Sequence, residues 1–387
     1  MDVDAPVTGV SVNRILVVKL ADMGDAILAT SAVGALRRAH PYARIDVLTA
    51  GAGAAVFGMC KAVDEVLTLN KAAFDQPTGL LNPLAAASLL ALTARLKARS
   101  YDTIVLLHHL TTHFGARKFG WLSAAIGATK RVGLDNGHGT FLTDRVFDLG
   151  FGAKSVHDYG LDVVALLGAD RRGARPEVSV PAEAEGEVDE LLRATGVPED
   201  FVVIHPSVGD YAAARNWYPE RFAFVASALY RSFRLPAVLV GASDAMDASQ
   251  QIAQDVLSMN LVGRTTVPQL ASLLRRARLV IGADSGVVHL AAALEVPTIA
   301  IFGPSNQQSW SPVGAVSEEE FLRDPTRSRV VLVRSEIPCS PCFYVGFSLG
   351  RRDGCHLRTC LDLLSADRVT QIASAILTET APQKSAN

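Results

Sequence analysis

Two carboxylates flank a glycine in a short turn near the start of the chain. The apolar run Ile15–Lys19 predicts a buried strand, and Asp22, Gly24 and Asp25 follow it before a helix-like pattern that continues to Leu36. Ligands lie at the carboxyl ends of strands in doubly wound α/β domains, so these acids could have a catalytic or binding role. A structural interpretation also stands, because Asp25 occupies the place of a helix N-cap residue.

A second candidate site lies at a strand-to-helix turn in the C-terminal half. The run Leu279–Gly282 predicts a strand, and Asp284, Ser285 and Gly286 follow it. Backbone N–H groups and the helix dipole favour an anion there, and a glycine permits close approach of a phosphate. His289 lies about one turn further on, where it could point at a diphosphate or bridge helix and loop. The structural alternative is a helix N-cap formed by the aspartate or the serine.

The loop from Ser207 to Trp217 contributes one strong cation, Arg215. A guanidinium beside a cleft suits a leaving pyrophosphate, because it can form two charge-assisted hydrogen bonds at once. An ordinary surface arginine is the alternative interpretation.

Three histidines, His108, His109 and His113, follow the predicted strand Tyr101–Leu107. Their spacing does not match standard zinc motifs. A polar loop that faces a substrate, or an ordinary surface, explains them better than a metal.

Composition limits what the whole chain can be. Hydrophobic residues form 49% of its 387 residues and the mean hydropathy is +0.24, which is typical of a globular protein with about two domains. The 37 basic and 39 acidic residues give a formal net charge of −2. A dedicated nucleic-acid binder normally has a basic excess, so we expect no nucleic-acid partner.

The N-terminal segment is acidic and lacks the pattern of a signal peptide, so we expect a cytoplasmic protein without disulfides. The most apolar helical stretch, Pro83 to Leu96, is shorter than the ~20 residues that span a bilayer. Asn82 predicts its N-cap. We expect this helix to face the core, and an interfacial contact with a membrane is the alternative.

Strands alternate with helices along both halves of the chain, which predicts parallel sheets. Strands are expected at Arg44–Thr49 and, in the second half, at Phe201–Ile204, Ala237–Gly241 and Leu261–Gly263. The stretch Arg171–Pro181 has no apolar periodicity and predicts an interdomain linker.

Taken together, these motifs resemble glycosyltransferase family 9, the bacterial heptosyltransferase family. They follow the family's order along nearly the whole chain: Lys19–Asp25, His205-Pro206, Arg215–Pro219, Leu261–Gly263, Gly282–His289 and Gly303–Ser305. The resemblance implies an α/β protein of the GT-B fold, with two Rossmann-like lobes whose parallel sheets face an interdomain cleft. Residues 1–180 would bind the acceptor. Residues 181–387, with a cysteine-containing segment at 339–360 and a C-terminal helix, would bind the nucleotide sugar.

The function implied by the resemblance is inverting transfer of a heptose from ADP-heptose to a hydroxyl of the lipopolysaccharide core. Asp25 matches the family's catalytic base, and Arg215 matches its phosphate-binding cation, commonly a lysine. Asp284, Ser285 and Gly286, with His289, match the donor site. No cofactor is then required for catalysis, because the cation and the N–H groups would stabilise the leaving ADP. One departure, the second acid Asp22, leaves the identity of the base open at this stage.

Four cysteines form a further departure. The pattern C-x2-C followed by C-x4-C is within the loose range of structural zinc or iron sites, and autotransporter heptosyltransferases are thought to bind iron through a comparable cluster. The tentative ligands are Cys339, Cys342, Cys355 and Cys360. Buried or redox-inert thiols are the alternative.

Two rival functions stay open. One is a GT-B glycosyltransferase with another nucleotide-sugar donor or with a protein acceptor, as in the autotransporter type. The other is a nucleotide-binding module without turnover. The expected location is the cytoplasm, and peripheral contact with the inner membrane stays open.

Overall fold

The computed structural model describes residues 12–70 and 82–380. Within these ranges, no helix combines the length and the hydropathy needed to cross a membrane. Contacts divide the chain into two compact units. The N-terminal unit comprises Met1–Asp22, Ala29–Leu149 and His157–Glu177, and the C-terminal unit comprises Met23–Leu28, Gly150–Val156 and Val178–Asn387.

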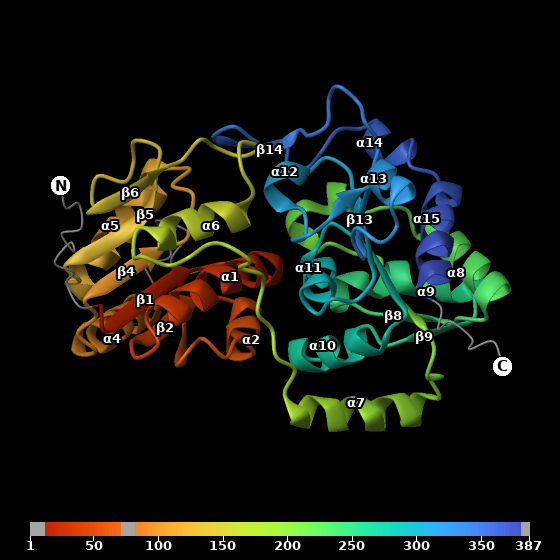
Figure 1. Cartoon of the computed structure of the whole chain (residues 1–387), viewed down its shortest axis with the longest axis horizontal. Coiled ribbons are helices and arrows are strands. Elements are labelled where there is room, and N and C mark those ends of the chain that lie inside the picture. Colours follow the sequence, from red (N-terminus) through yellow and green to blue (C-terminus); the bar gives the residue numbers. More distant parts are fainter. Residues whose placement is uncertain (1–11, 71–81, 381–387) are drawn as a thin grey trace, which may run out of the picture. The chain divides into compact units, whose positions relative to one another are not determined.

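The N-terminal unit is built on a parallel six-stranded sheet with the order β3-β2-β1-β4-β5-β6 (Figure 1). Ile15 in β1 pairs with Ile45 on one side and with Thr103 on the other. The strand order reverses between β1 and β4, as in Rossmann domains. The strands are β1 (Arg14–Lys19), β2 (Arg44–Thr49), β3 (Glu65–Thr68), β4 (Thr103–Leu106), β5 (Lys130–Asp135) and β6 (Asp144–Phe147).

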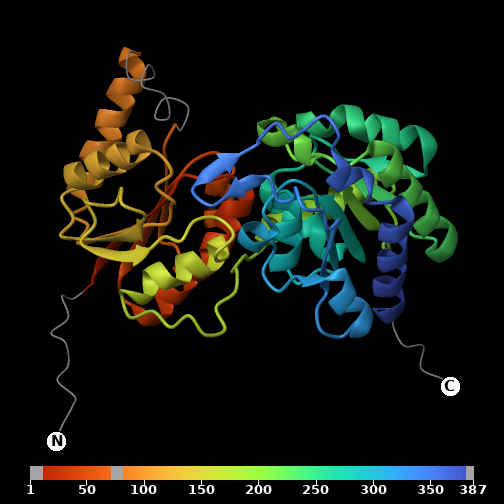
Figure 2. The same cartoon turned by 90° about the horizontal axis from the view of Figure 1, so that it is seen from above.

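Helices connect these strands and cover the sheet. Alternate strand residues face opposite sides, and Leu16 and Val18 pack in one cluster with Leu96 and Leu122. Thus α4 and α5 cover one face, and Figure 2 shows them side by side in orange. The helices are α1 (Met23–Ala39), α2 (Gly53–Gly58), α4 (Pro83–Ala98), α5 (His113–Ile126) and α6 (Val156–Ala165).

The C-terminal unit repeats this plan. Its parallel seven-stranded sheet has the order β12-β13-β11-β10-β7-β8-β9, which reverses between β7 and β10. An antiparallel hairpin, β14-β15, stands apart from this sheet. The strands are β7 (Val202–His205), β8 (Ala237–Leu239), β9 (Ser258–Asn260), β10 (Leu279–Ala283), β11 (Thr298–Phe302), β12 (Val316–Ser317), β13 (Val330–Arg334), β14 (Phe343–Val345) and β15 (Ser348–Gly350).

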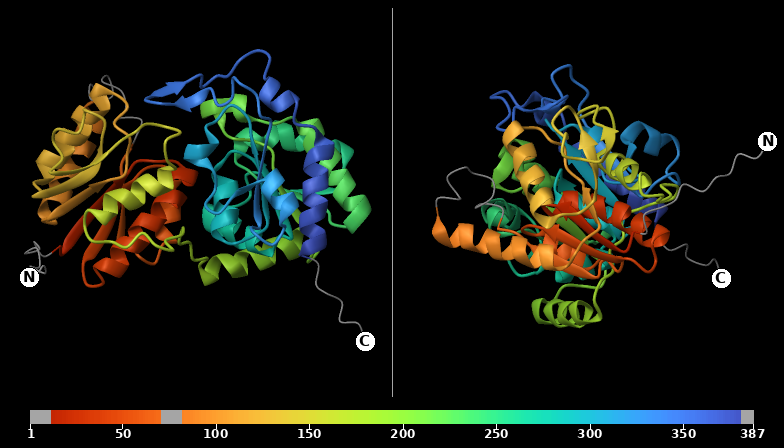
Figure 3. Two further views of the ribbon diagram at one scale, coloured as in Figure 1. Left: turned by 45° about the horizontal axis from the view of Figure 1, so that its top comes forward. Right: turned by 90° about the vertical axis from the view of Figure 1, so that its left-hand side faces the viewer.

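The larger core of this unit lies between the sheet and two helices, α8 and α15. Ile204 and Ile281 from the sheet pack with Phe222 from α8 and Ile376 from α15. Figure 3 shows α15 in dark blue beside the green α8. The helices are α7 (Ala182–Thr195), η2 (Asp210–Arg215), α8 (Pro219–Phe233), η3 (Ser243–Ala245), α9 (Met246–Asp255), α10 (Val267–Arg276), α11 (Gly286–Ala293), α12 (Gln307–Trp310), α13 (Glu318–Arg323), α14 (Thr359–Asp362) and α15 (Ala366–Glu379).

Two local predictions are wrong. The strand expected at Leu261–Gly263 lies earlier, at Ser258–Asn260. The side chain of Asn260 accepts a hydrogen bond from the backbone N–H of Val262 at 3.0 Å, and this Asx turn ends the strand. The N-cap residue of α1 is Asp22 rather than Asp25, which lies in the first turn of the helix.

Helix α4 begins as predicted but does not face the core as expected. Asn82 caps its first turn and Pro83 stands at its start. However, only Thr93 and Leu96 are buried, while Leu84 is 78% exposed and Leu90 is 63% exposed. The apolar composition of this helix therefore does not reflect burial.

Candidate active site at the start of α11

The carboxyl edge of the second sheet brings His205 and Ser285 together. His205 ends β7 and Ser285 follows β10, and these strands are neighbours at the point where the strand order reverses. The Ser285 Oγ lies 3.1 Å from Nδ1 of His205. Burial lowers the pKa of His205 to about 4, so the ring is neutral at neutral pH. Ligands of open α/β sheets bind at such a reversal, so this edge is the expected binding edge.

Arg215, at the end of η2, is held against the same edge by Asp284. Its Nη1 donates to the Asp284 carbonyl at 3.1 Å and to Oδ2 of the same residue at 3.2 Å. The side chains of Arg215 and Asp284 are 16% and 5% exposed. The Nε of Arg215 is buried and has no hydrogen-bond partner among the described residues. The guanidinium is therefore fixed in place with a donor left for an anionic ligand.

The N-terminus of α11 has the features of an anion site. Ser285 stands at its N-cap position but makes no capping hydrogen bond to the first N–H groups through its side chain. His289 is buried one turn later, and its Nδ1 has no partner within residues 12–70 and 82–380. Burial lowers the pKa of His289, and the nearby charges of Asp284 and Asp25 oppose this shift. Uncapped N–H groups beside a neutral histidine suit a phosphate group.

The first turn of α1 packs against the start of α11. Contacts place Met23–Leu28, and with it Asp25, in the C-terminal unit. A methyl group on Gly286 would stand 2.6 Å from the Cε of Met23 and 3.0 Å from the backbone nitrogen of Gly24. A methyl group on Gly24 would stand 3.1 Å from Cδ2 of His289. The close approach that the structure shows at Gly286 is thus that of α1, whereas the sequence suggested a phosphate.

The two acids of the first turn differ in their surroundings. Asp22 is exposed, belongs to the N-terminal unit and makes no capping hydrogen bond through its side chain. Asp25 is half-buried and close enough to His289 for its charge to affect the pKa of that ring. The structure therefore brings Asp25, rather than Asp22, together with the residues around α11.

Tyr344 is a site residue that the sequence analysis missed. Its ring lies 5.0 Å from that of Trp310, and Tyr211 is close enough to its hydroxyl to raise its pKa. Burial raises its pKa strongly, and the charge of Asp25 adds to this shift while that of Arg215 opposes it. Tyr344 also has a φ of +60°, an uncommon value for a non-glycine residue. Nothing in the sequence marks it, because its strained backbone and its neighbours arise only from the fold.

The three histidines after β4 take separate structural roles. The Nε2 of His108 accepts a hydrogen bond from the backbone N–H of Leu20 at 2.7 Å, which ties the end of β1 to β4. The Nδ1 of His109 lies 3.0 Å from the buried carboxylate of Asp148. His113 begins α5. Their contacts therefore lie on different parts of the N-terminal unit.

The four cysteines of segment 339–360 are not arranged as a metal centre. All are free thiols: Cys339 and Cys355 are exposed, Cys342 is half-buried and Cys360 is buried. Burial raises the pKa of Cys342, and the neighbouring thiols Cys355 and Cys339 add to this shift. Yet no group of three or more His, Cys, Asp or Glu side chains in the described chain could hold a metal ion. The tentative zinc or iron site is therefore not supported, because the thiols are neighbours without forming a ligand set.

Comparison with known proteins identifies the family. The sequence model described as glycosyltransferase family 9 (heptosyltransferase) matches residues 89–350. The chain belongs to this family. It is 27% identical to lipopolysaccharide heptosyltransferase 3 of Escherichia coli over 301 residues, which cover 75% of this chain and 83% of the relative. As a family 9 glycosyltransferase, it has Arg215 and the Asp284–His289 stretch inside the matched region, while Asp25 precedes it.

Solved structures confirm the predicted α/β fold. A family 9 glycosyltransferase from Veillonella parvula has a TM-score of 0.74 at 20% identity and covers 96% of this chain, with 99% of that chain covered. The heptosyltransferase WaaC of Escherichia coli, solved with ADP-2-deoxy-2-fluoro heptose, has a TM-score of 0.66 at 18% identity and covers 94% of this chain, with 99% of that chain covered. The two parallel sheets are thus those of GT-B heptosyltransferases.

Proposed function

We propose that this chain is an inverting heptosyltransferase that moves a heptose from ADP-heptose to a hydroxyl of the lipopolysaccharide core. The observation that best supports the proposal is the packing of the first turn of α1, which carries Asp25, against the start of α11. A carboxylate and an anion site thereby share one compact unit. The donor and acceptor are suggested by the names of the relatives, one a lipopolysaccharide heptosyltransferase and one solved with an ADP-heptose analogue.

In the proposed reaction, the acceptor oxygen attacks the anomeric carbon of the heptose while its proton passes to the Asp25 carboxylate. The bond from that carbon to the diphosphate oxygen breaks, and both of its electrons leave with ADP. Arg215 and the first N–H groups of α11 stabilise the charge that develops on the departing diphosphate. The chemistry is proton transfer and charge stabilisation by this chain's own residues, and no step is assigned to a metal.

The role of Asp25 is tested by replacing it with asparagine, with Asp22→Asn as the matched control. We expect Asp25→Asn to lower transfer by about 10²–10⁴-fold, the usual contribution of a general base, while ADP binding stays intact. Asp22→Asn should retain transfer, because that exposed side chain lies in the other unit. Retained transfer in Asp25→Asn would rule out Asp25 as the base.

The donor is tested separately by the thermal stabilisation that a panel of nucleotide diphosphates and sugar nucleotides gives. We expect ADP and ADP-heptose to stabilise the chain most. A preference for UDP or GDP would overturn the heptose donor while leaving the fold untouched, and would favour another nucleotide-sugar donor. Transfer to a protein acceptor, or nucleotide binding without any turnover, would identify the other rival functions. A cytoplasmic location belongs to the same proposal, because the donor is a nucleotide sugar.

A further inference from the structure

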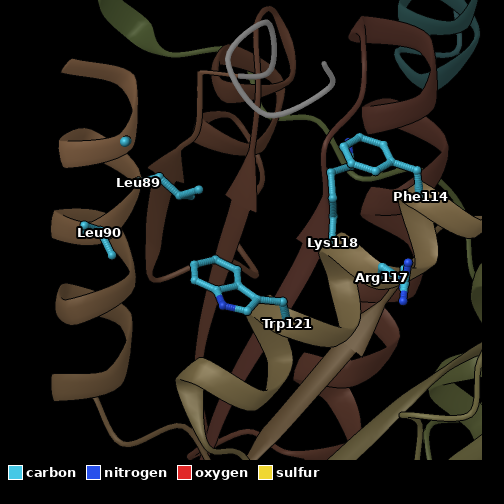
Figure 4. A pocket seen from close by; sticks show the side chains of 7 residues that line it. Leu89, Leu90, Phe114, Arg117, Lys118 and Trp121 are labelled. Atoms are coloured by element: carbon cyan, nitrogen blue, oxygen red, sulfur yellow. The ribbon is translucent and has the colours of Figure 1, made fainter. Parts of the chain in front are cut away.

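An exposed apolar surface lies on the N-terminal unit, formed by two neighbouring helices. From α4, Leu84 is 78% exposed and Leu90 is 63% exposed, and from α5, Phe114 is 39% exposed and Trp121 is 45% exposed. A pocket of about 480 Å³ lies between the helices, and Leu89 and Trp121 point into it (Figure 4). We call this the α4–α5 surface. It comprises Leu84, Leu90, Phe114, Arg117, Lys118 and Trp121.

Packing against the protein core does not explain the apolar composition of helix α4. Only Thr93 and Leu96 of α4 are buried, although the helix is rich in leucine and alanine. Single apolar side chains on a surface are ordinary, but a contiguous apolar pocket with large exposed neighbours marks an interaction site. The α4–α5 surface therefore has the character of a docking surface rather than of an ordinary solvent-exposed surface.

The charge of this surface indicates the kind of partner. Neither α4 nor α5 contains an aspartate or a glutamate, while the pocket is lined by Arg117 and Lys118. The Lys118 ammonium lies 5.1 Å from the centre of the Phe114 ring, so cation and apolar group are presented together. The chain as a whole carries a formal net charge of −2, so the positive character is local. Basic residues around an apolar face complement an anionic lipid surface.

We propose that the α4–α5 surface docks on an anionic lipid bilayer. Trp121, Phe114 and the two leucines would enter the interfacial region, and Arg117 and Lys118 would contact the headgroups. Helix α4, Pro83–Ala98, is shorter than the ~20 residues of a membrane-spanning helix, so it would lie along the surface. The proposal does not depend on the proposed function, because it rests on no residue of the active site.

The test is sedimentation of the full chain with vesicles, using phosphatidylcholine alone or mixed with phosphatidylglycerol. The double variant Arg117→Glu/Lys118→Glu should lower partitioning onto the anionic vesicles by at least about 25-fold, since each cation near a membrane contributes about fivefold. Its matched control, Lys61→Glu/Arg231→Glu, changes two exposed cations elsewhere and should bind as the wild type does.

The apolar part is tested by Leu84→Gln/Leu90→Gln. Its control is Leu257→Gln/Leu322→Gln, since these leucines are 59% and 47% exposed elsewhere in the chain. We expect a tenfold or greater loss of partitioning in the first variant only. In the wild type, fluorescence of the exposed Trp121 should shift to the blue on anionic vesicles and be quenched by brominated lipid, a readout that needs no variant.

Several results would overturn the proposal. These are a wild type that binds no anionic vesicles at low salt, a Trp121 that lipid does not quench, and controls that lose as much binding as the test variants. A dimer in sedimentation velocity that Leu84→Gln/Leu90→Gln dissociates would instead assign the surface to a second copy of the chain. Transfer to an acceptor without acyl chains should be equal in all four variants, which keeps the result separate from the proposed reaction.

Discussion

The Arg215–Asp284 ion pair allows the most direct test of how the site is held together. Replacing Arg215 by methionine keeps an unbranched apolar stem but leaves the Asp284 carboxylate, which is 5% exposed, without its cation. At the 3.2 Å that separates the two groups, opposite charges attract by about 5 kcal/mol for an effective dielectric constant of ~20. Desolvation of both groups cancels much of that attraction.

The cost of breaking the pair follows from the charge left behind. Removing one partner of a buried ion pair destabilises a protein by about 3–5 kcal/mol. Because Arg215 is 16% exposed, water can reach the site, and we expect Arg215→Met to lower the free energy of unfolding by about 2–4 kcal/mol. The double variant with Asp284→Asn should lose less than the sum of the single variants, because no buried charge then stands alone.

The assay is urea unfolding followed by tryptophan fluorescence for the wild type, both single variants and the double variant. Trp217 is 1% exposed in the core of the same unit and reports its unfolding. We expect a coupling energy of about 1.5–3 kcal/mol between the two positions. A coupling below about 0.5 kcal/mol would refute the pairing, because independent sites add within that margin.

The same variants separate structure from ligand binding. If Arg215 also contacts the diphosphate, Arg215→Met should reduce the thermal stabilisation by ADP, whereas Asp284→Asn should reduce it less. A loss of stability without any loss of ADP binding would mean that Arg215 only forms the ion pair with Asp284 and does not contact the diphosphate. The buried Nε of Arg215, without a partner in the described chain, is the reason that we expect the first result.

Two further predictions concern His205 and Tyr344. Burial lowers the pKa of His205 in the folded chain to about 4, from an ordinary value of 6.5. As the pH falls, the unfolded chain therefore binds the proton first. The free energy of unfolding should fall from pH 6.5 down to about 4, by about 3 kcal/mol at most. Urea unfolding across this pH range should show that decrease in the free energy of unfolding for the wild type and a smaller decrease for His205→Asn. An equal decrease in both proteins would contradict the prediction. Tyr344→Phe removes the hydroxyl that lies near Tyr211, and should lower kcat at saturating donor by about fivefold while the melting temperature changes little. An unchanged kcat would show that this hydroxyl does not position the reacting groups.

Most regular elements could be predicted because local patterns determine them. The apolar run Arg44–Thr49 is β2 with the bounds expected, and Ala182–Thr195 is α7. Where the pattern misleads, a side chain or the tertiary structure decides. Asn260 ends β9 through an Asx turn, and the apolar α4 remains largely exposed because the sheet covers only one edge of it. Neither outcome can be deduced from hydrophobic periodicity.

For the candidate site too, some residues could be predicted from the sequence and others could not. Asp25, Arg215 and Asp284 could be selected from the sequence, because each follows a predicted strand or lies in a loop beside one. Their interactions could not be predicted, since Arg215 and Asp284 are 69 positions apart and pair only when β7 and β10 are neighbours. Tyr344 required the fold itself, because its strained backbone and its contact with Tyr211 have no local pattern.

The glycines on either side of the α1–α11 contact support the choice of Asp25 as the proposed base. A base must be held within a fraction of an ångström of the hydroxyl that it serves. The turn that carries Asp25 packs closely, because a methyl group on Gly286 would stand 2.8 Å from the Cβ of Met23 and one on Gly24 would stand 3.1 Å from Cδ2 of His289. Asp22 precedes this contact and is exposed. The close packing of two helix N-termini, which a list of acidic residues cannot disclose, therefore favours Asp25 and makes both glycines determinants of the geometry of the proposed reaction.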